Sequence, residues 1–274
     1  MQTKNTNQKQ IKNKKIISKA EIKKMLEGSL ADFSNTDIEE LYKLNSKKLI
    51  KKRAKGVPLQ YLLKEWEFYS LPFKVGKGVL IPRPETELLV DIALDNLKEN
   101  DKVLDICSGS GAIAVAIAKS KEAGGKNIKT AAIEKSRKAF FYLKENIKLN
   151  HALVTPIKAN AFNLKKALKK SELKKFNLIT SNPPYIAKEE YGGLQREVKF
   201  EPKIALISKN DPLKFYKKIT LQSEDILEKN GKIIFEVGFS QAKAVEQILQ
   251  KHNFKTQIFK DYSNNDRVVL GTKQ

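Results

Sequence analysis

The 274-residue sequence predicts an α/β fold, a doubly wound seven-stranded sheet with its last strand antiparallel, and a small helical domain ahead of it. From Lys102 onward, short apolar strands alternate with helices, which is typical of a mainly parallel sheet covered on both faces. The last two strands are joined by the short segment Asp261–Asn265, which has no room for a crossover helix. That pair is therefore expected to be antiparallel.

Three segments follow from the composition and the periodicity. Residues 1–18 form a polar basic tail, residues 19–75 a helical domain that ends in a hairpin linker, and residues 76–274 the α/β domain. Helices are expected first over 19–28 and 36–54, then the hairpin over 66–69 and 73–75, then a helix that Pro84 opens and that runs to about Leu97. In the α/β domain we expect strands at 102–106, 128–133, 153–158, 177–181, 231–237, 254–260 and 266–271, and helices near 111–121, 136–149, 213–229 and 240–251.

The composition limits the possible environments and cofactors. No apolar run approaches the roughly 20 residues that a bilayer requires, and no signal-peptide core follows the basic N-terminus. Cys107 is the single cysteine, which fits a reducing compartment, so a cytoplasmic protein without membrane attachment is expected. His151 and His252 lie far apart and have no cysteine partners, so no metal site is expected.

The formal net charge is +22, from 48 lysines and 5 arginines against 31 acidic residues. Such a charge predicts weak association with the ribosome or with RNA. However, arginine is the residue suited to bidentate phosphate binding, and it is scarce here. A lysine-rich solvated surface with no dedicated partner is the alternative interpretation.

A glycine-rich turn follows the first strand of the sheet and precedes a helix. It comprises Cys107, Ser108, Gly109, Ser110 and Gly111, a pattern that lets the backbone approach a ligand closely. Glu134 ends the next strand, where a carboxylate can accept hydrogen bonds from two ribose hydroxyls, and Ala161 follows the third, where an adenine ring would lie. The turn therefore predicts a nucleoside-containing cofactor, although a dinucleotide or simple tight packing would also explain it.

A second motif, Asn182, Pro183, Pro184 and Tyr185, follows the fourth strand. An amide nitrogen is a poor nucleophile with two N–H donors. An asparagine oxygen and a fixed backbone carbonyl can accept both and orient it. The prolines restrict the backbone, and the tyrosine offers a flat face to a planar group. A proline-bracketed turn is the structural alternative, but it leaves the asparagine and the aromatic residue unexplained.

With both motifs in place, the chain resembles the protein-(glutamine-N5) methyltransferases that modify the Gly-Gly-Gln loop of peptide chain release factors. The segments that carry the resemblance are Gly56–Tyr61, Val79–Glu87, Glu201–Leu206, Glu236–Gly238 and Asp266–Val268. The sequence departs from the family pattern at several positions. Lys64 and Cys107 stand where glycine is usual, Glu134 where aspartate is usual, and Asn160–Ala161 where an acid is often followed by an aromatic residue.

The resemblance implies a class I S-adenosylmethionine-dependent methyltransferase whose helical domain binds the release factor as protein substrate. It implies that S-adenosylmethionine is contacted by Cys107, Ser108, Gly109, Ser110, Gly111, Glu134, Ala161 and Asn182, and that the glutamine amide is held by Asn182, Pro183, Pro184 and Tyr185. The alternatives are an amino-methyltransferase acting on nucleic acid or on a ribosomal protein glutamine, and a catalytically inactive protein that binds ribosomes. An enzyme that acts on nucleic acid would be expected to carry an added target-recognition domain, and the sequence shows none.

Overall fold

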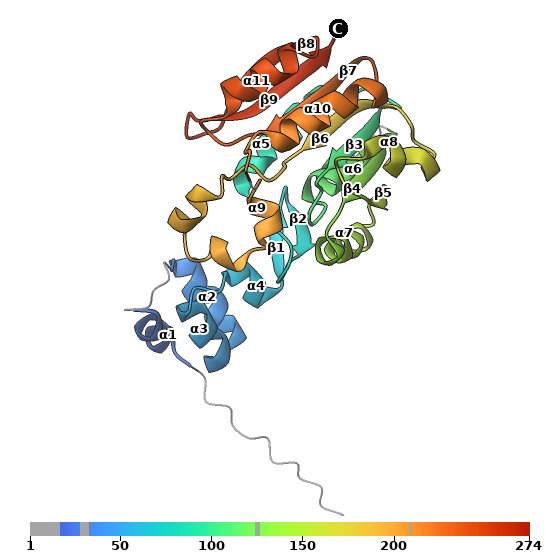
Figure 1. Ribbon diagram of the computed structural model, residues 1–274. Helices are drawn as coiled ribbons and strands as arrows, with labels where there is room; N and C mark the ends of the chain where they lie inside the picture. The colour runs from blue at the N-terminus through green and yellow to red at the C-terminus, as the bar shows by residue number, and fades with distance from the viewer. Residues whose placement is uncertain (1–16, 28–32, 124–126, 209) are drawn as a thin grey trace, which may run out of the picture. The chain divides into compact units, whose positions relative to one another are not determined.

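The computed structural model describes residues 17–27, 33–123, 127–208 and 210–274 (Figure 1). The chain divides into two compact units, residues 1–59 and 60–274. The sequence interpretation ended the N-terminal domain at residue 75 and so grouped the hairpin with the first helices, whereas here the hairpin belongs to the second unit. The expected tail over residues 1–18 lies outside the described residues apart from Ile17 and Ser18.

The first unit contains three short helices, α1 Lys19–Leu26, α2 Asn35–Leu44 and α3 Lys47–Ala54. Ser34 begins α2 with a capping box, in which its hydroxyl accepts from the Asp37 backbone N–H while the Asp37 carboxylate accepts from that of Ser34. The same carboxylate forms a buried ion pair with Arg53 of α3. The apolar side chains Ile22, Leu26, Leu41 and Ile50 fill the interior of this unit.

The predicted helix over residues 36–54 is wrong as a single element, because Asn45 divides it. Asn45 adopts a left-handed backbone with φ +41°, which asparagine tolerates better than most residues, and it ends α2. Its side-chain oxygen accepts a hydrogen bond from the Ile17 backbone N–H at 2.9 Å. This tertiary bond stabilises the break, although apolar periodicity continues across it.

The boundary between the units falls within the first residues of α4 Leu59–Leu63, and the hairpin of β1 Glu65–Phe68 and β2 Leu71–Lys74 follows in the second unit. Lys64 connects α4 to β1 with φ +68°, a conformation that explains why glycine is usual at this position. Asn146 joins the hairpin to the rest of the unit. Its side chain accepts from Lys74 N at 2.7 Å and donates to Lys74 O at 3.1 Å and to Ser110 O at 2.9 Å.

The seven strands of the main sheet lie where the sequence predicts them, with end positions that differ by up to four residues. They are β3 Lys102–Ile106, β4 Lys129–Glu134, β5 Val154–Lys158, β6 Phe176–Ser181, β7 Leu227–Glu236, β8 Phe254–Lys260 and β9 Asp266–Lys273. Their order is β5-β4-β3-β6-β7-β9-β8 (Figure 1). The last strand, β9, is antiparallel to both of its neighbours, as the sequence predicts, and it is inserted between β7 and β8.

The helices of this unit form two layers, one on each face of the sheet (Figure 1). One layer contains α5 Glu87–Asp95, α6 Ala112–Ala123 and α7 Arg137–Leu149, and the other contains α8 Leu164–Ala167, α10 Lys214–Ile226 and α11 Ala242–Gln250. The predicted helix from residue 85 starts instead as the 3-10 turn η1 Pro84–Thr86. Shorter elements precede α10, namely η2 Leu168–Lys170, η3 Glu189–Gly193, η4 Val198–Phe200 and α9 Lys203–Leu206. Across the described ranges, no helix is both long and apolar enough to cross a membrane.

The strand order determines where a ligand can bind. After β3 the chain builds β4 and β5 on one side of it, then returns to place β6 on the other side. The direction of winding therefore reverses at β3. In open α/β sheets, ligands bind at such a reversal, beyond the carboxyl ends of the strands. Both motifs singled out in the sequence emerge there, from β3 and from β6.

Candidate active site

The turn after β3 is shaped by three residues with left-handed backbones, Cys107 (φ +64°), Gly109 (φ +56°) and Gly111 (φ +85°). Glycine is favoured at position 111 because its φ is positive and because a Cβ there would lie 2.5 Å from a methyl carbon of Leu143, which would have to move. Cys107 adopts the conformation that favours glycine, which accounts for the glycine usual at this position. Burial raises the pKa of its thiol, so the thiol stays protonated and lacks the reactivity of a thiolate.

Glu134, at the carboxyl end of β4, braces this turn. One oxygen of its carboxylate accepts from Gly109 N at 2.9 Å and the other from Ser136 N at 2.5 Å. Burial raises the pKa of Glu134, while the backbone N–H groups of Ser136, Gly109 and Lys135 oppose the increase. A carboxylate has about four lone-pair positions, so these three donors leave room for one further donor. A ribose hydroxyl is a donor of the kind that this position could accept.

The turn after β5 places at the site an aromatic residue, Phe162, that the sequence interpretation did not assign to it. Ala161 lies at the cavity as expected, and the adjacent Phe162 lines it too. The Phe162 ring contacts Phe215 of α10, with 4.9 Å between centroids. Asn160 accepts from Phe162 N at 3.1 Å and so holds the turn. An aromatic face is therefore present one residue beyond the place where the family pattern has it.

Asn182 to Tyr185 follow β6 and are held from two sides. The Asn182 side-chain nitrogen donates to Thr86 Oγ1 at 3.3 Å, and Gln241 Nε2 donates to the Tyr185 carbonyl at 2.8 Å. Burial raises the pKa of Tyr185 to about 12, so its phenol is neutral at physiological pH. The segment is thereby fixed at both ends, and the Asn182 oxygen is the end of that amide directed away from Thr86.

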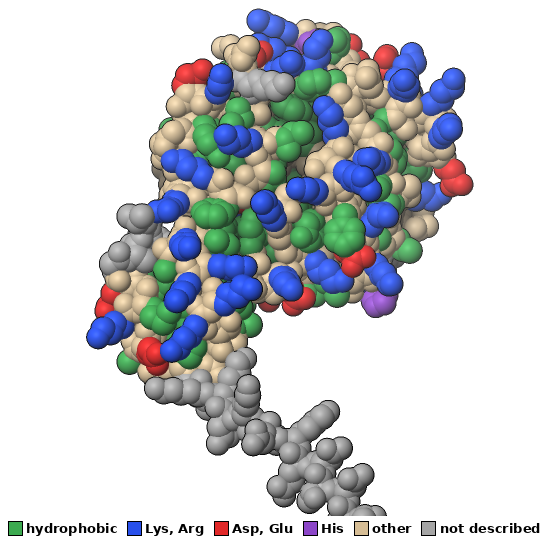
Figure 2. Space-filling model, turned by 60° about the horizontal axis from the view of Figure 1, so that its bottom comes forward, with side chains coloured by type: hydrophobic (Ala, Val, Ile, Leu, Met, Phe, Trp, Pro, Cys, Tyr) green, Lys and Arg blue, Asp and Glu red, His purple; other side chains and the backbone are tan. Residues whose placement is uncertain are grey.

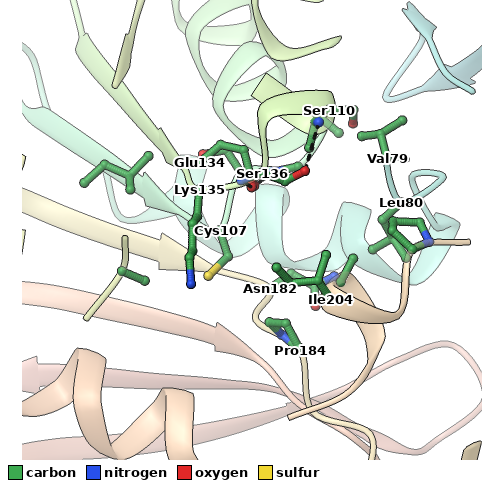
Figure 3. Close-up of a pocket in the computed structure, with 18 of the residues that line it drawn as sticks. Val79, Leu80, Cys107, Ser110, Glu134, Lys135, Ser136, Asn182, Pro184 and Ile204 are labelled. Carbon is green, nitrogen blue, oxygen red and sulfur yellow. Dashed lines mark hydrogen bonds between the residues drawn. The ribbon is translucent and has the colours of Figure 1, made fainter. Parts of the chain in front are cut away.

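Most of the residues predicted for the site line a single cavity (Figure 3). Of the predicted cofactor and catalytic residues, it is lined by Cys107, Ser108, Gly109, Ser110, Glu134, Ala161, Asn182 and Pro184. Gly111, Pro183 and Tyr185 are not among its lining residues, although the turns to which they belong reach it. Figure 3 shows Cys107, Glu134 and Ser136 gathered on one side, with Asn182, Pro184 and Ile204 on another.

Two further segments complete the cavity, and neither was assigned to the site from the sequence. One comprises residues 78–86, including Leu80, Arg83 and Thr86, and the other residues 202–205. Glu201 joins them, since its carboxylate forms an ion pair with Arg83 and accepts from Ile81 N at 2.9 Å. Both segments contain stretches that match the family pattern. That match is the sequence feature from which their presence at the site could have been inferred.

The sheet order, the glycine turn braced by Glu134 and the motif after β6 together define a class I methyltransferase, whose methyl donor is S-adenosylmethionine. Residues 84–198 match the family model described as the methyltransferase small domain. The structure of a methyltransferase from Pyrococcus furiosus shares the fold, with TM-score 0.54 and 19% identity over 75% of this chain and 90% of that chain.

The sequence relatives identify the family. The release factor glutamine methyltransferase of Fusobacterium nucleatum subsp. nucleatum is 41% identical over 260 residues, which are 93% of this chain and 71% of that protein. That of Thermodesulfovibrio yellowstonii is 41% identical over 230 residues, 82% of this chain and 79% of that protein. The chain belongs to the release factor glutamine methyltransferase family.

The residues at the cavity fit S-adenosylmethionine. The Glu134 carboxylate has acceptor capacity left for a ribose hydroxyl, and Phe162 in the cavity wall could provide a flat apolar surface for an adenine ring. A Cβ on Gly109 would project into open space, so the bare backbone leaves room for a ligand to approach the turn. Among the residues that the structure describes, no group of three or more histidine, cysteine, aspartate or glutamate side chains could hold a metal ion.

Proposed function

We propose that this protein transfers a methyl group from S-adenosylmethionine to the side-chain amide nitrogen of the glutamine in the Gly-Gly-Gln motif of peptide chain release factors. The observation that carries the proposal is the position of Asn182 and Pro184 in the wall of the same cavity as the glycine turn and Glu134. Membership of the release factor glutamine methyltransferase family supports this choice of substrate. Release factors act in translation termination, so we place the reaction in the cytoplasm.

When bound, S-adenosylmethionine supplies the methyl group as an electrophilic carbon on a sulfonium. Asn182 accepts one amide N–H of the substrate through its side-chain oxygen, and the Pro183 carbonyl accepts the other. These two acceptors turn the nitrogen lone pair toward the methyl carbon and stabilise the positive charge that grows on the nitrogen. After methyl transfer to the nitrogen, the amide would be acidic and would lose one proton to water, so no side chain of this protein would have to act as a base.

Tyr185 and the neighbouring prolines restrict the geometry of the acceptor. The neutral Tyr185 ring provides a planar surface for the amide, and the bond from Gln241 holds its backbone. Alignment of the two reactants is the larger part of the rate enhancement in a transfer of this kind. We assign binding of the body of the release factor to the helices of residues 19–59, in keeping with the family resemblance.

Mass spectrometry tests the proposal directly. Purified enzyme is incubated with a release factor and S-adenosylmethionine, and the Gly-Gly-Gln peptide is then fragmented. We expect one added methyl group on the glutamine side chain, and none on a matched release factor in which that glutamine is replaced by alanine. Methylation of RNA, DNA or a ribosomal protein in parallel reactions, with no methylation of the release factor, would overturn the assignment.

We also propose a weak, salt-dependent association with RNA through the lysine-rich surface. Figure 2 shows lysine and arginine side chains scattered over the displayed face and not gathered into one patch. A net charge of +22 that is spread in this way favours nonspecific attraction to phosphates. Filter binding with single-stranded RNA should give an affinity that falls steeply between about 50 and 200 mM salt. Binding that is insensitive to salt would contradict this.

A further inference from the structure

A chain of two hydrogen bonds leads from the catalytic amide into the core. The Asn182 side-chain nitrogen donates to Thr86 Oγ1 at 3.3 Å, and the Thr86 hydroxyl donates to Glu236 Oε2 at 2.6 Å. Thr86 belongs to the turn before α5 and also lines the cavity, while Glu236 ends β7. Both side chains are buried, with 4% and 2% of their surface exposed, so water does not substitute for either partner.

The number of donors determines the direction of this chain. A threonine hydroxyl has one proton, and an ionised carboxylate can only accept. While Glu236 is ionised, the Thr86 proton is therefore committed to Glu236, and the Thr86 oxygen can only accept from its other neighbour. That neighbour is Asn182, whose amide has a donor end and an acceptor end. The donor end must face Thr86, and the hydrogen bond of the Asn182 side chain to the Glu236 carboxylate requires the same orientation. The oxygen of Asn182 is then directed toward the substrate.

We infer that Thr86 and Glu236 are positioning residues that set the orientation of the Asn182 amide and so present its oxygen to the substrate glutamine. The inference rests on the proposed function, since it assigns a role in that reaction. An Asn182 amide rotated by half a turn would present N–H groups to the N–H groups of the substrate. Such a pairing is repulsive and cannot orient the lone pair of the nitrogen.

We call the hydrogen-bonded chain Asn182–Thr86–Glu236 the relay. It also makes the orientation of the Asn182 amide sensitive to pH. Protonated Glu236 can donate to Thr86, whose own proton then points at Asn182 and requires the amide oxygen there. The groups that face Glu236 from the elements packed around it are Glu85 and Thr86 of the turn before α5, Asn182 and Tyr185 after β6, Tyr216 of α10 and Arg267 of β9. Burial, the largest influence, raises the pKa of Glu236 to about 7, while the hydrogen bonds from Thr86 and Asn182 and the charge of Arg267 oppose it. The productive orientation should therefore be lost as pH falls through about 7.

Kinetics of two matched variants test the relay. Thr86→Val keeps the size of the side chain and removes the hydroxyl, whereas Thr86→Ser keeps the hydroxyl. We expect kcat to fall at least about tenfold in Thr86→Val, because small misplacements of reacting groups cost up to about 10² in rate. The KM for the release factor should change less than about twofold, since its remote contacts supply the binding. Thr86→Ser should retain most of the wild-type kcat. Equal losses in the two variants, or an unchanged kcat in Thr86→Val, would overturn the inference.

The pH profile separates positioning from a structural role. In the wild type kcat should rise as pH increases through about 7, and in Glu236→Gln this rise should be absent because nothing titrates at that position. A loss of packing would lower the melting temperature without removing the step in the profile. A Glu236→Gln enzyme that keeps the step would show that another group produces it and would refute the relay.

A readout that needs no turnover keeps the inference distinct from the proposed function. The side-chain amide resonances of Asn182 in ¹⁵N-labelled protein can be assigned by their absence in Asn182→Ala. They should shift with an apparent pKa near 7 in the wild type and not in Glu236→Gln or Thr86→Val. An absence of this shift in the wild type overturns the relay even if the release factor is methylated. An inactive wild type that shows the shift would instead refute the proposed function alone.

Discussion

Replacement of Glu134 by glutamine is the sharpest test of the cofactor site. The carboxylate accepts from Gly109 N and Ser136 N, and the backbone N–H of Lys135 is a third donor to it. About one lone-pair position is then available to a ribose hydroxyl. Glu134→Gln converts one oxygen into an NH₂ group, so one backbone N–H and one ribose hydroxyl would each face a donor. The shape of the side chain is almost unchanged.

The size of the effect follows from these bonds. A hydrogen bond to a charged group contributes about 1.5–3 kcal/mol, and about 1.4 kcal/mol corresponds to a factor of ten in affinity. The loss of one charged acceptor for the ribose should therefore weaken S-adenosylmethionine binding about 10- to 150-fold. Removal of the charge also removes the cost of burying it, the largest influence on the pKa of Glu134. The free protein should therefore lose less stability than the complex.

Isothermal titration calorimetry with S-adenosylmethionine measures the affinity, and thermal unfolding without cofactor reports the fold. Glu134→Asp is the matched control, because it keeps both oxygens and restores the residue usual in the family. We expect it to retain most of the affinity. An unchanged dissociation constant in Glu134→Gln would remove this carboxylate from the cofactor site. An equally large loss in Glu134→Asp would show that side-chain length, and not the acceptor count, governs binding.

Three further predictions follow from other residues. Asn182→Ala should lower kcat about 10²–10³-fold with little change in the KM for the release factor, because one hydrogen bond made in the transition state is lost. Methylation time courses followed by mass spectrometry measure this. Turnover equal to wild type would show that the methyl acceptor is held elsewhere. Lys64→Gly should stabilise the protein by about 0.5–1 kcal/mol, because Lys64 is exposed at φ +68° and a side chain there is strained. Urea unfolding measures this change in the free energy of unfolding. The control Lys64→Ala keeps the Cβ and should show no comparable gain. Burial raises the pKa values of Asp105 and Glu236 to about 7. The contribution of these groups to the free energy of unfolding is therefore complete below the pKa values of the unfolded chain, near 4, and is lost as pH rises through about 7. Urea unfolding at pH values on both sides of about 7 should show a smaller decline in the free energy of unfolding in Glu236→Gln than in wild type.

The parts of the site that lie within one strand and its following turn could be predicted from the sequence. The turn from Cys107 to Gly111 and the segment from Asn182 each follow a strand directly, and the end of a parallel strand in such a sheet is a ligand site. Thr86 and Phe162 were missed for different reasons. Thr86 reaches Glu236 across 150 positions of sequence, and no local pattern reports that contact. Phe162 belongs to the predicted turn, but its place at the cavity beside Phe215 of α10 depends on a contact between distant segments.

The same distinction holds for the fold. Alternating strands and helices, and the short link before β9, were sufficient to predict a mainly parallel sheet whose last strand runs the other way. They did not place β9 between β7 and β8, and they did not divide the helix at Asn45. In the first case the choice depends on which edges pair to bury the apolar faces of β9. In the second it depends on the bond between Asn45 and Ile17.

The sequence by itself determined the periodicity of the elements, the two ligand turns and the chemistry of the side chains placed there, because these depend on residues within a few positions of one another. The tertiary structure decided the strand order, the boundary between the units and the partners of the buried polar groups. It also showed why glycine is usual at the positions of Lys64 and Cys107, since both residues have left-handed backbones. These features depend on contacts between distant segments, whose free energy is gained only when the chain has folded around them.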